Sequence, residues 1–350
     1  MQKAHPDEVQ VVYWRWRRWV GLSNFFILST LCALRGARIA HLHWWRFNVD
    51  QRFPFSKSIS GLTSRAALRW LIFLRFRLIW TVHNITPHEA QTRDDLQLAK
   101  EVAAAASSLI VHSPSVVAML AERSIPIDRV AVISQGSYID TYQAPANRTE
   151  ARRLLGLDPD QKIVLFFGLI RGYKGVAELI QTWQSQERGA RLFIVGQAVD
   201  LPLVEQLQTM AKDDSSIELR FGRVEEDDVP LWISAADFVC LPFTKVTTSS
   251  SAVLALSLSV PVIAPMLGTL ADLPEDTGYF YDPDDGLGLN AALNRALQAS
   301  DEDRAMRAHA ALEFAGSTSW SMISEETFNL YLKVLETPQP QRSKRGKGRS

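Results

Sequence analysis

The sequence has little cysteine and no long apolar run. Its two cysteines, Cys32 and Cys240, lie far apart inside apolar segments of a 350-residue chain. Two distant thiols exclude a disulfide framework and a cysteine-based metal site, and they are typical of a reducing compartment. No apolar stretch reaches the ~18–20 residues that span a bilayer, and the polar residues 1–10 do not have the pattern of a signal peptide. We therefore expect a cytoplasmic protein, long enough for two α/β domains.

The formal net charge is zero, but the charges are unevenly distributed along the chain. Residues 1–100 carry 15 Lys and Arg against 6 Asp and Glu, and seven of the ten tryptophans also lie there. Cations and tryptophan rings together favour an anionic membrane surface, so we expect peripheral attachment to the inner face of a cell membrane. A nucleic-acid patch, or a solvated face above a tryptophan-rich core, is the alternative. The acidic second half and the lack of a nucleic-acid-binding motif argue against nucleic acid.

Short apolar segments alternate with segments of helical spacing along most of the chain. The expected strands are residues 9–14, 37–44, 78–83, 108–112 and 130–134, and then 163–168, 191–196, 217–221, 238–241 and 261–264. This alternation predicts parallel sheets that helices cover on both faces. The expected fold class is therefore α/β, with two Rossmann-like doubly wound domains facing a cleft. In such sheets ligands bind outside the carboxyl ends of the strands.

Turn residues and composition place the domain boundaries. The first domain is expected over residues 1–142, followed by a polar linker over 143–160 that contains turn residues such as Gly156. The second domain is expected over 161–318 and a closing helix over 319–337. The basic tail, residues 338–350, has a composition typical of disorder.

The segment FFGLIRGYKG, residues 166–175, carries the strongest signal for an anion site. An apolar strand ends at Gly168, a short loop holds Arg171 and Lys174, and a helix begins after Gly175. The free amides of a helix N-terminus attract anions, and a guanidinium and an ammonium add positive charge. The spacing predicts a diphosphate pocket, although arginine and lysine in such loops usually just face solvent. The loop is neither a Walker P-loop nor G-x-G-x-x-G, so a dinucleotide oxidoreductase is not supported.

A run of hydroxyl side chains, TTSSS at residues 247–251, directly precedes another expected helix. Thr248, Ser249, Ser250 and Ser251 could bind an anion through their hydroxyls and the free amides of the helix start. Taken alone, a helix cap is the simpler explanation. Two such sites in one domain favour a shared ligand.

Histidines follow several expected strands of the first half. The segment TVHNITPHE places His83 at the carboxyl end of an apolar strand, with His88 and Glu89 after a proline turn. A lone histidine is more often structural, but two histidines and a carboxylate within seven positions favour an acid, a base or a hydrogen-bond donor to a ligand. The spacing is not that of a zinc site, so no metal is expected. Similar strand-end positions are held by His41, His43 and His112.

These segments together resemble a bacterial GT-B glycosyltransferase near glycosyltransferase family 4. The matching segments are HLHW (41–44), TVHN (81–84), VHS (111–113), FFGLIRGYKG (166–175), LFIVGQ (192–197), LWISAADFVCLPF (231–243) and SVPVIAP (259–265), with Trp320 and Tyr331 in the closing helix. The resemblance implies that Arg171 and Lys174 bind the donor diphosphate and that His83 reaches the transferred sugar. It also implies that the loop at residues 222–224, with Arg223 and Val224, holds the nucleotide base. Gly168, Gly196 and the hydroxyls of Thr248, Ser249, Ser250 and Ser251 are further candidates for donor contacts.

One departure concerns two glutamates that the family carries eight positions apart before the PVIA segment. The corresponding residues here are Val246 and Leu254, whose side chains cannot accept a hydrogen bond. The hydroxyls of residues 247–251 are the expected substitute. A retaining and an inverting outcome therefore both stay open. A second departure is Gln135, where related sequences often have a histidine.

The resemblance implies a glycosyltransferase that moves a hexose from a GDP- or UDP-sugar to a hydroxyl of a glycan or lipid-linked oligosaccharide, in exopolysaccharide or cell-surface glycan assembly. The nucleotide sugar is a co-substrate. No cofactor or metal is expected, because Arg171, Lys174 and the helix amides would stabilise the leaving diphosphate. A GT-B sugar-nucleotide epimerase and a catalytically inactive GT-B scaffold subunit are the alternatives.

Overall fold

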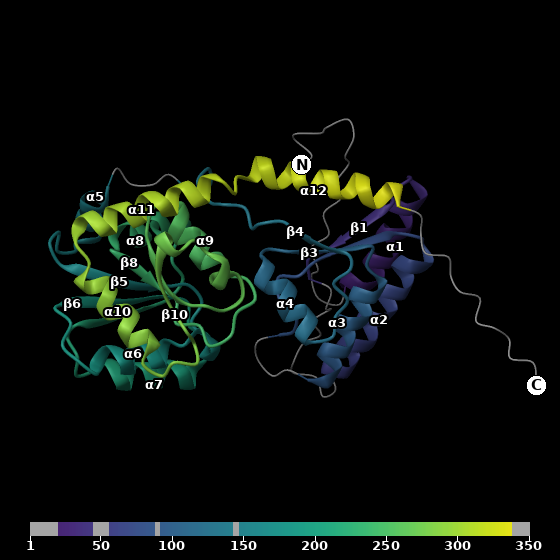
Figure 1. The fold of residues 1–350 in the computed structure, drawn as a ribbon. Helices are drawn as coiled ribbons and strands as arrows, with labels where there is room; N and C mark the ends of the chain where they lie inside the picture. The colour runs from purple at the N-terminus through teal and green to yellow at the C-terminus, as the bar shows by residue number, and fades with distance from the viewer. Residues whose placement is uncertain (1–19, 45–55, 88–91, 143–146, 338–350) are drawn as a thin grey trace, which may run out of the picture.

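The computed structural model describes residues 20–44, 56–87, 92–142 and 147–337, which form two α/β domains (Figure 1). The first domain contains α1 (Val20–Leu34), β1 (Ile39–Leu42), α2 (Ser56–Phe73), β2 (Arg77–Thr81), α3 (Arg93–Ala105), β3 (Ser108–Val111), α4 (Pro114–Glu122) and β4 (Val130–Val132). The second contains β5 (Lys162–Phe167), α6 (Val176–Gln184), β6 (Ala190–Gly196), α7 (Leu201–Ala211), β7 (Ile217–Phe221), α8 (Val229–Ala235), β8 (Phe238–Cys240), α9 (Ser250–Ser257), β9 (Val262–Pro265), β10 (Gly278–Tyr281), α10 (Gly288–Gln298) and α11 (Asp301–Gly316). Between them lies α5 (Arg148–Leu155), and α12 (Trp320–Glu336) ends the described chain.

The first sheet is parallel, with the strand order β1-β2-β3-β4. Because right-handed crossovers between sequential parallel strands put their helices on one side, this order leaves the opposite face uncovered by them. Leu78 and Trp80 of β2 accordingly pack into one cluster with buried residues of α2, α3 and α4. The expected class of parallel α/β domains is confirmed. Within the described part of the first domain the strand order does not reverse. The expected strand 9–14 lies outside the described residues.

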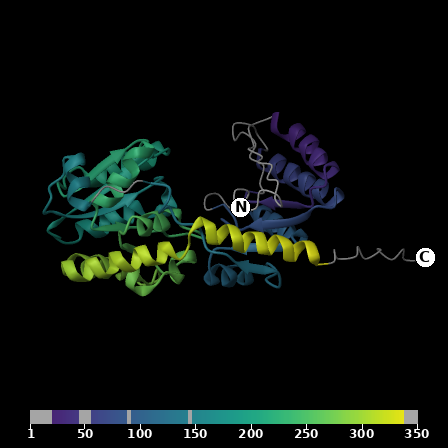
Figure 2. The ribbon, with the colours of Figure 1, turned by 90° about the horizontal axis from the view of Figure 1, so that it is seen from above.

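The opposite face of the first sheet is covered by α12, the last helix of the described residues. Ile79 and Ile110 point to this face and pack with Val334, Leu330 and neighbouring side chains of α12. Figures 1 and 2 show α11 lying along the second domain and α12 continuing along the first. The carboxyl-terminal helix therefore completes the core of the amino-terminal domain.

The second sheet is also parallel, with the strand order β10-β9-β8-β5-β6-β7. The chain builds outward from β5 to β7, then returns to the other side of β5 and builds outward again from β8 to β10. This reversal puts helices on both faces, with α6, α7 and α10 on one side and α8, α9 and α11 on the other (Figure 1). Consecutive side chains of the long strands β5 and β6 are buried, because helices cover both faces of the sheet, and this explains the apolar sequences of the two strands.

The segment between the two sheets is partly helical. Asn147 caps α5 by accepting a hydrogen bond from the Glu150 amide, and Gly156 ends the helix in the left-handed conformation. Arg152 on α5 is buried and donates to the carboxylate of Asp237, the residue before β8. The carboxyl half of the segment predicted as a linker therefore packs against the second domain.

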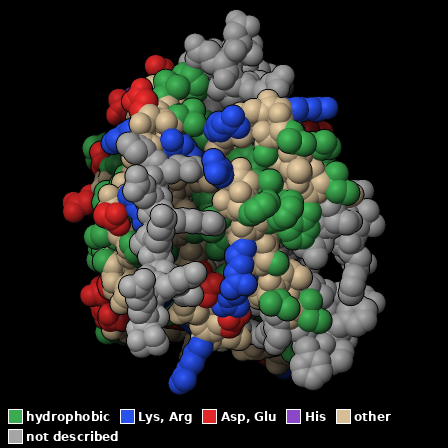
Figure 3. Space-filling model, turned by 90° about the vertical axis from the view of Figure 1, so that its right-hand side faces the viewer, with side chains coloured by type: hydrophobic (Ala, Val, Ile, Leu, Met, Phe, Trp, Pro, Cys, Tyr) green, Lys and Arg blue, Asp and Glu red, His purple; other side chains and the backbone are tan. Residues whose placement is uncertain are grey.

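One surface of the first domain exposes apolar side chains beside basic ones (Figure 3). On α1 these are Ile27, Leu28, Leu31 and Leu34, and on α2 they are Ile59, Leu62 and Phe73. Their helical spacing makes one stripe along each helix. The exposed cations Arg35, Arg38, Arg69 and Arg75 lie on these helices or just after them. Among the described residues no helix is both long and apolar enough to cross a membrane.

Candidate functional site

The reversal of strand order in the second sheet falls between β5 and β8. At such a point the helices that follow the two strands lie on opposite faces of the sheet, and α/β proteins bind ligands in the crevice outside the carboxyl ends of the two strands. The loop after β5 carries Arg171 and Lys174, and the segment after β8 leads to the hydroxyl run at the start of α9. The topology therefore brings together the two predicted anion sites.

Two glycines allow these loops to touch. Gly175 has φ +69°, and a Cβ atom there would lie 1.8 Å from the carbonyl oxygen of Pro242. Gly168 has φ +130°, and its Cβ would lie 3.4 Å from Oγ of Ser251. The backbone amide of Thr244 also donates to the carbonyl of Tyr173 at 3.0 Å. The loops are thus in contact along their backbones, and only glycine fits where they are closest.

Lys174 is a half-buried cation held above an aromatic ring. Its Nζ lies 3.7 Å from the centroid of the Phe243 ring, and no carboxylate of the described residues pairs with it. Burial lowers the pKa of Lys174 to about 8. Half-buried Arg171 precedes the 3₁₀ turn Gly172–Lys174, and α6 begins directly after Gly175 without a side-chain cap from the described residues. A diphosphate placed here would meet two cations and the free amides of a helix start.

The hydroxyl side chains of residues 247–251 have different roles. The Ser249 hydroxyl caps α9 by accepting from the Ala252 amide at 3.3 Å, and Ser250 accepts from Nε2 of Gln135 in the first domain at 2.9 Å. The Oγ1 atom of Thr248 is buried and has no hydrogen-bond partner among the described residues. Thr248 and Ser251 are therefore the hydroxyls best placed to meet a ligand at the start of α9.

The two positions where the resemblance to family 4 predicts glutamate belong to the hydrophobic core here. Val246 is 6% exposed and Leu254 is 9% exposed, and both pack in the core cluster of the second domain. Neither backbone position presents its side chain to the crevice. Polar contacts to a donor must then come from the loop after β5, the hydroxyls and the helix amides.

The remaining donor-site candidates lie at the same sheet edge, farther from the reversal. Gly196 ends β6 with φ +149°, and a Cβ there would lie 1.9 Å from the Gly168 carbonyl oxygen, so packing against the β5 loop requires this glycine. Arg223 is exposed and Val224 packs against the core, in the loop after β7. Because β7 is two strands from β5, these residues can reach only the far end of an elongated ligand.

Four histidines line the carboxyl edge of the first sheet. His83 follows β2, and it lies between His43 after β1 and His112 after β3, with ring centroids 5.2 and 5.3 Å apart. His41 stacks on His43 and bonds the Tyr331 hydroxyl of α12 at 2.6 Å. The sequence analysis predicted that His83 lies at a strand end, but it did not predict the row. The feature that could have indicated the row is a histidine after each of three adjacent parallel strands. His88 and Glu89 lie outside the described residues.

The two domains meet beside this row. Ser115 at the start of α4 donates through its amide and its hydroxyl to the carboxylate of Asp272, at 2.8 and 2.9 Å. A cavity of about 120 Å³ between the domains is lined by His112 and Ser113 from one side and Ser249 and Thr269 from the other. The Ser113 hydroxyl is buried without a hydrogen-bond partner among the described residues. A largely apolar cavity with a few hydroxyl groups therefore lies between His112, at one end of the histidine row, and the start of α9.

Trp320 and Tyr331 of α12 contact the histidine row and the segment that crosses between the domains. A Cβ at Gly136 would lie 2.6 Å from the ring of Trp320, so the chain passes directly beneath that ring. Gln135, which precedes this glycine, makes the bond to Ser250. The closing helix thus holds both the domain crossover and His41.

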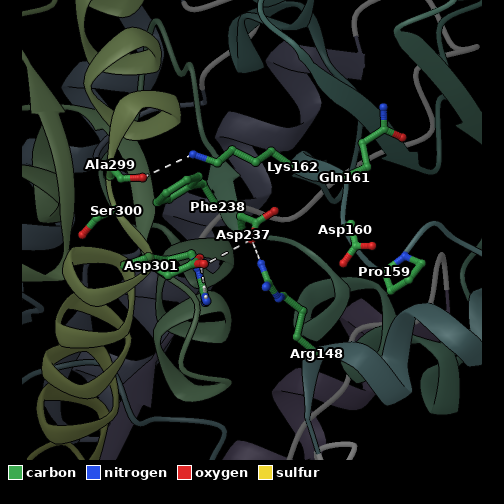
Figure 4. Close-up of a pocket in the computed structure, with 11 residues that line it drawn as sticks. Arg148, Pro159, Asp160, Gln161, Lys162, Asp237, Phe238, Ala299, Ser300 and Asp301 are labelled. Atoms are coloured by element: carbon green, nitrogen blue, oxygen red, sulfur yellow. Dashed lines mark hydrogen bonds and ion pairs between the residues drawn. The ribbon is translucent and has the colours of Figure 1, made fainter.

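A second cavity lies at the opposite, amino edge of the second sheet (Figure 4). Its centre is Asp237, 2% exposed in its side chain, which pairs with Arg148, Arg152 and Arg304 and accepts from the Ile163 amide at 2.7 Å. These contacts join α5, β5, β8 and α11. Ligands of α/β sheets bind at the other edge, so this cluster has a structural role.

No group of three or more potential metal ligands occurs among the described residues. Both cysteines are free: Cys32 is half-buried on α1, and Cys240 is buried in β8 of the other domain. The described positive charges at the crevice are those of Arg171 and Lys174, beside the free amides at the start of α6.

This chain is similar to known proteins both in sequence and in fold. Residues 161–299 match the family model of glycosyl transferases group 1. The chain is 26% identical over 350 residues to a GDP-mannose:glycolipid 4-beta-D-mannosyltransferase of Xanthomonas campestris pv. campestris, covering 95% of this chain and 86% of that protein. Among solved structures, Anabaena Alr3699/HepE in complex with UDP and glucose has a TM-score of 0.68 at 19% identity, covering 79% of this chain and 77% of that one.

A sucrose-phosphate synthase of Thermosynechococcus elongatus gives a TM-score of 0.73 at 22% identity, covering 90% of this chain and 78% of that one. These structural likenesses confirm the expected fold, and the sequence matches confirm the expected enzyme class. The chain is a glycosyltransferase of the GT-B fold, similar to glycosyltransferase family 4, and its residues 161–299 match the model of the glycosyl transferases group 1.

Proposed function

We propose that this enzyme transfers a hexose from a GDP- or UDP-sugar to a hydroxyl of a glycan or lipid-linked oligosaccharide, in exopolysaccharide or cell-surface glycan assembly. The observation that carries the proposal is Lys174, a half-buried cation with no carboxylate partner among the described residues, next to Arg171 and the start of α6. Burying a cation without an anion costs free energy, and a diphosphate would offset this cost. The similarity to a GDP-mannose:glycolipid mannosyltransferase makes GDP-mannose the first donor to test.

The donor diphosphate would lie outside the carboxyl ends of β5 and β8, against the loops that follow these strands. Arg171 and Lys174 would neutralise the charge that develops on the leaving group, and the hydroxyls of Thr248 and Ser251 would bind its oxygens. Val246 and Leu254 contribute no polar contact, so Thr248, with its unpaired buried hydroxyl, takes a larger share of donor recognition. No metal is required for this scheme.

A donor screen followed by a transfer assay tests this function. Thermal unfolding is measured with GDP, UDP, GDP-mannose and UDP-glucose, and radiolabelled sugar from the stabilising donor is then offered with lipids extracted from bacterial membranes. We expect stabilisation by one nucleotide family and label in the lipid fraction. Stabilisation by no nucleotide would indicate an inactive scaffold, and conversion of the donor sugar without any acceptor would indicate an epimerase.

In the same proposal the first domain binds an anionic membrane surface, from which the acceptor reaches the site. The apolar stripes of α1 and α2 and the arginines beside them match a layer of acyl chains below anionic headgroups. The double variant Leu31→Ser and Leu34→Ser should lose cosedimentation with vesicles that contain phosphatidylglycerol. Leu201→Ser, 73% exposed on α7 of the second domain, is the control and should still sediment. Equal sedimentation of wild type with neutral vesicles would contradict the role of the arginines.

A further inference from the structure

The histidines at the carboxyl edge of the first sheet form a directed hydrogen-bond chain. Nδ1 of His112 lies 2.9 Å from the carbonyl oxygen of Ile133, and Nε2 of His112 lies 3.4 Å from Nδ1 of His83. Nε2 of His83 then lies 3.0 Å from Nδ1 of His43. The three rings come from three adjacent strands, so the sheet itself sets their spacing.

The carbonyl at one end fixes the direction of this chain. A carbonyl oxygen only accepts, so His112 carries its proton on Nδ1, and a neutral ring then offers Nε2 as an acceptor. His83 must donate to it from Nδ1, which leaves Nε2 of His83 to accept from Nδ1 of His43. Burial lowers the pKa of all three rings, for His83 to about 4, which favours the neutral forms that this arrangement needs.

Only the His43 end of the chain presents an unused lone pair. Both nitrogens of His83 are engaged, and Trp44 stacks on its ring with centroids 5.1 Å apart. His43 is the most exposed of the three rings, and its Nε2 atom has no hydrogen-bond partner within the described ranges of the chain. The nitrogen that can receive a proton from outside is therefore Nε2 of His43.

We propose that His43 is the catalytic base that takes the proton of the acceptor hydroxyl, and that His83 and His112 hold it in the correct tautomer and relay the charge. This inference rests on the glycosyl transfer proposed above. The acceptor oxygen forms its bond to the anomeric carbon, its proton passes to Nε2 of His43, and the bond to the donor diphosphate breaks with its electron pair leaving on the diphosphate. A single displacement of this kind inverts the anomeric configuration.

The relay then moves the positive charge along the row. His43 passes its Nδ1 proton to Nε2 of His83, and His83 passes its own Nδ1 proton to Nε2 of His112. The resulting imidazolium on His112 is stabilised by the Ile133 carbonyl. Because His112 lines the cavity that Ser249 also lines, the charge moves toward the domain that holds the leaving diphosphate.

The first test is a nuclear magnetic resonance measurement of histidine tautomers in the nitrogen-15-labelled full-length protein. We expect His43, His83 and His112 all to carry the proton on Nδ1 at neutral pH. In His112→Phe the anchor at Ile133 is lost, and His83 and His43 should change to the Nε2–H tautomer. An Nε2–H tautomer at any of the three rings in the wild type would overturn the chain, whatever the activity.

The second test separates this inference from the proposed function. With the donor identified by the screen and membrane lipid extract as acceptor, His43→Ala should lower kcat by about 10²–10⁴-fold, with the affinity for GDP or UDP within twofold of wild type. Added imidazole should restore part of the rate, which it would not do for a purely structural loss. His309→Ala, an exposed histidine of α11, is the control. A rate within threefold of wild type, or a product that retains the donor's anomeric configuration, would overturn the role of His43 and leave the glycosyltransferase function standing.

Discussion

The Nζ atom of Lys174 lies 3.7 Å from the centroid of the Phe243 ring, so the loop after β5 and the segment after β8 share one cation–π contact at the point where the sheet order reverses. A cation above a ring keeps part of its attraction without any carboxylate. The contact thereby holds the ammonium group in the crevice and leaves its remaining hydrogen-bond donors to a ligand.

The lowered pKa of Lys174 makes donor binding depend on pH. Below its pKa of about 8 the side chain is charged and binds a diphosphate, and above that value the free enzyme must first take up a proton. We expect the dissociation constant of GDP or UDP to be nearly constant from pH 6.5 to 7.5 and to rise by up to about tenfold per pH unit above 8. Isothermal titration calorimetry measures this profile. Lys174→Arg should bind with a flat profile, since arginine stays charged; a flat wild-type profile would contradict the assignment.

Gly175→Ala should destabilise the second domain more than a left-handed backbone alone explains. A Cβ at this position would meet the Pro242 carbonyl oxygen at 1.8 Å, so the two loops must separate. The control is Gly156→Ala, which has a similar φ of +67° but nothing within 4 Å, and should lose about 1–2 kcal/mol. Urea unfolding compares the two variants. Equal losses would show that the loops do not depend on their contact.

Asp237→Ala should be among the most destabilising single changes in the chain. It leaves the buried guanidinium of Arg152 without its carboxylate and removes an acceptor from the Ile163 amide, at a cost of about 3–5 kcal/mol. The control is Glu150→Ala, which removes the partner of exposed Arg153 on the solvent side of α5 and should change stability little. Denaturant unfolding measures the loss of stability in both variants. A small loss in Asp237→Ala would mean that Arg152 finds other acceptors.

His41 should make the first domain sensitive to acid. Its ring nitrogens bond the hydroxyls of Tyr331 and Thr81, and burial, with His43 and His83 nearby, lowers its pKa to about 3. Between pH 6.5 and 3 the unfolded chain binds a proton at this histidine and the folded chain does not, so the free energy of unfolding falls as the pH falls through this window. His41→Gln should lower stability at pH 7 and flatten the decrease of Tm below pH 6.5. An unchanged slope would place the acid sensitivity elsewhere.

Much of the fold could be predicted from periodicity, because strands buried on both faces are short apolar runs between helices. Arg171 and Lys174 could be located for a similar reason: a strand, a glycine and a helix start define the carboxyl edge of a sheet. The strand order could not be predicted from the sequence. The sequence therefore predicted that the two anion sites share a ligand, but not that Gly168 and Ser251 lie side by side. The histidine row depends on which strands are neighbours, and the coverage of the first sheet by α12 depends on contacts between residues more than 200 positions apart.

The most direct measurement of the central claim is the affinity of the free nucleotide diphosphate for wild type and Arg171→Ala. Arg171 and Lys174 are assigned to the diphosphate, so calorimetric titration with GDP and UDP should give a wild-type complex with one of them and a dissociation constant about 10- to 100-fold higher in the variant. Arg153→Ala, an exposed arginine of α5, should bind like wild type. Wild-type affinity in Arg171→Ala would contradict the donor site described here.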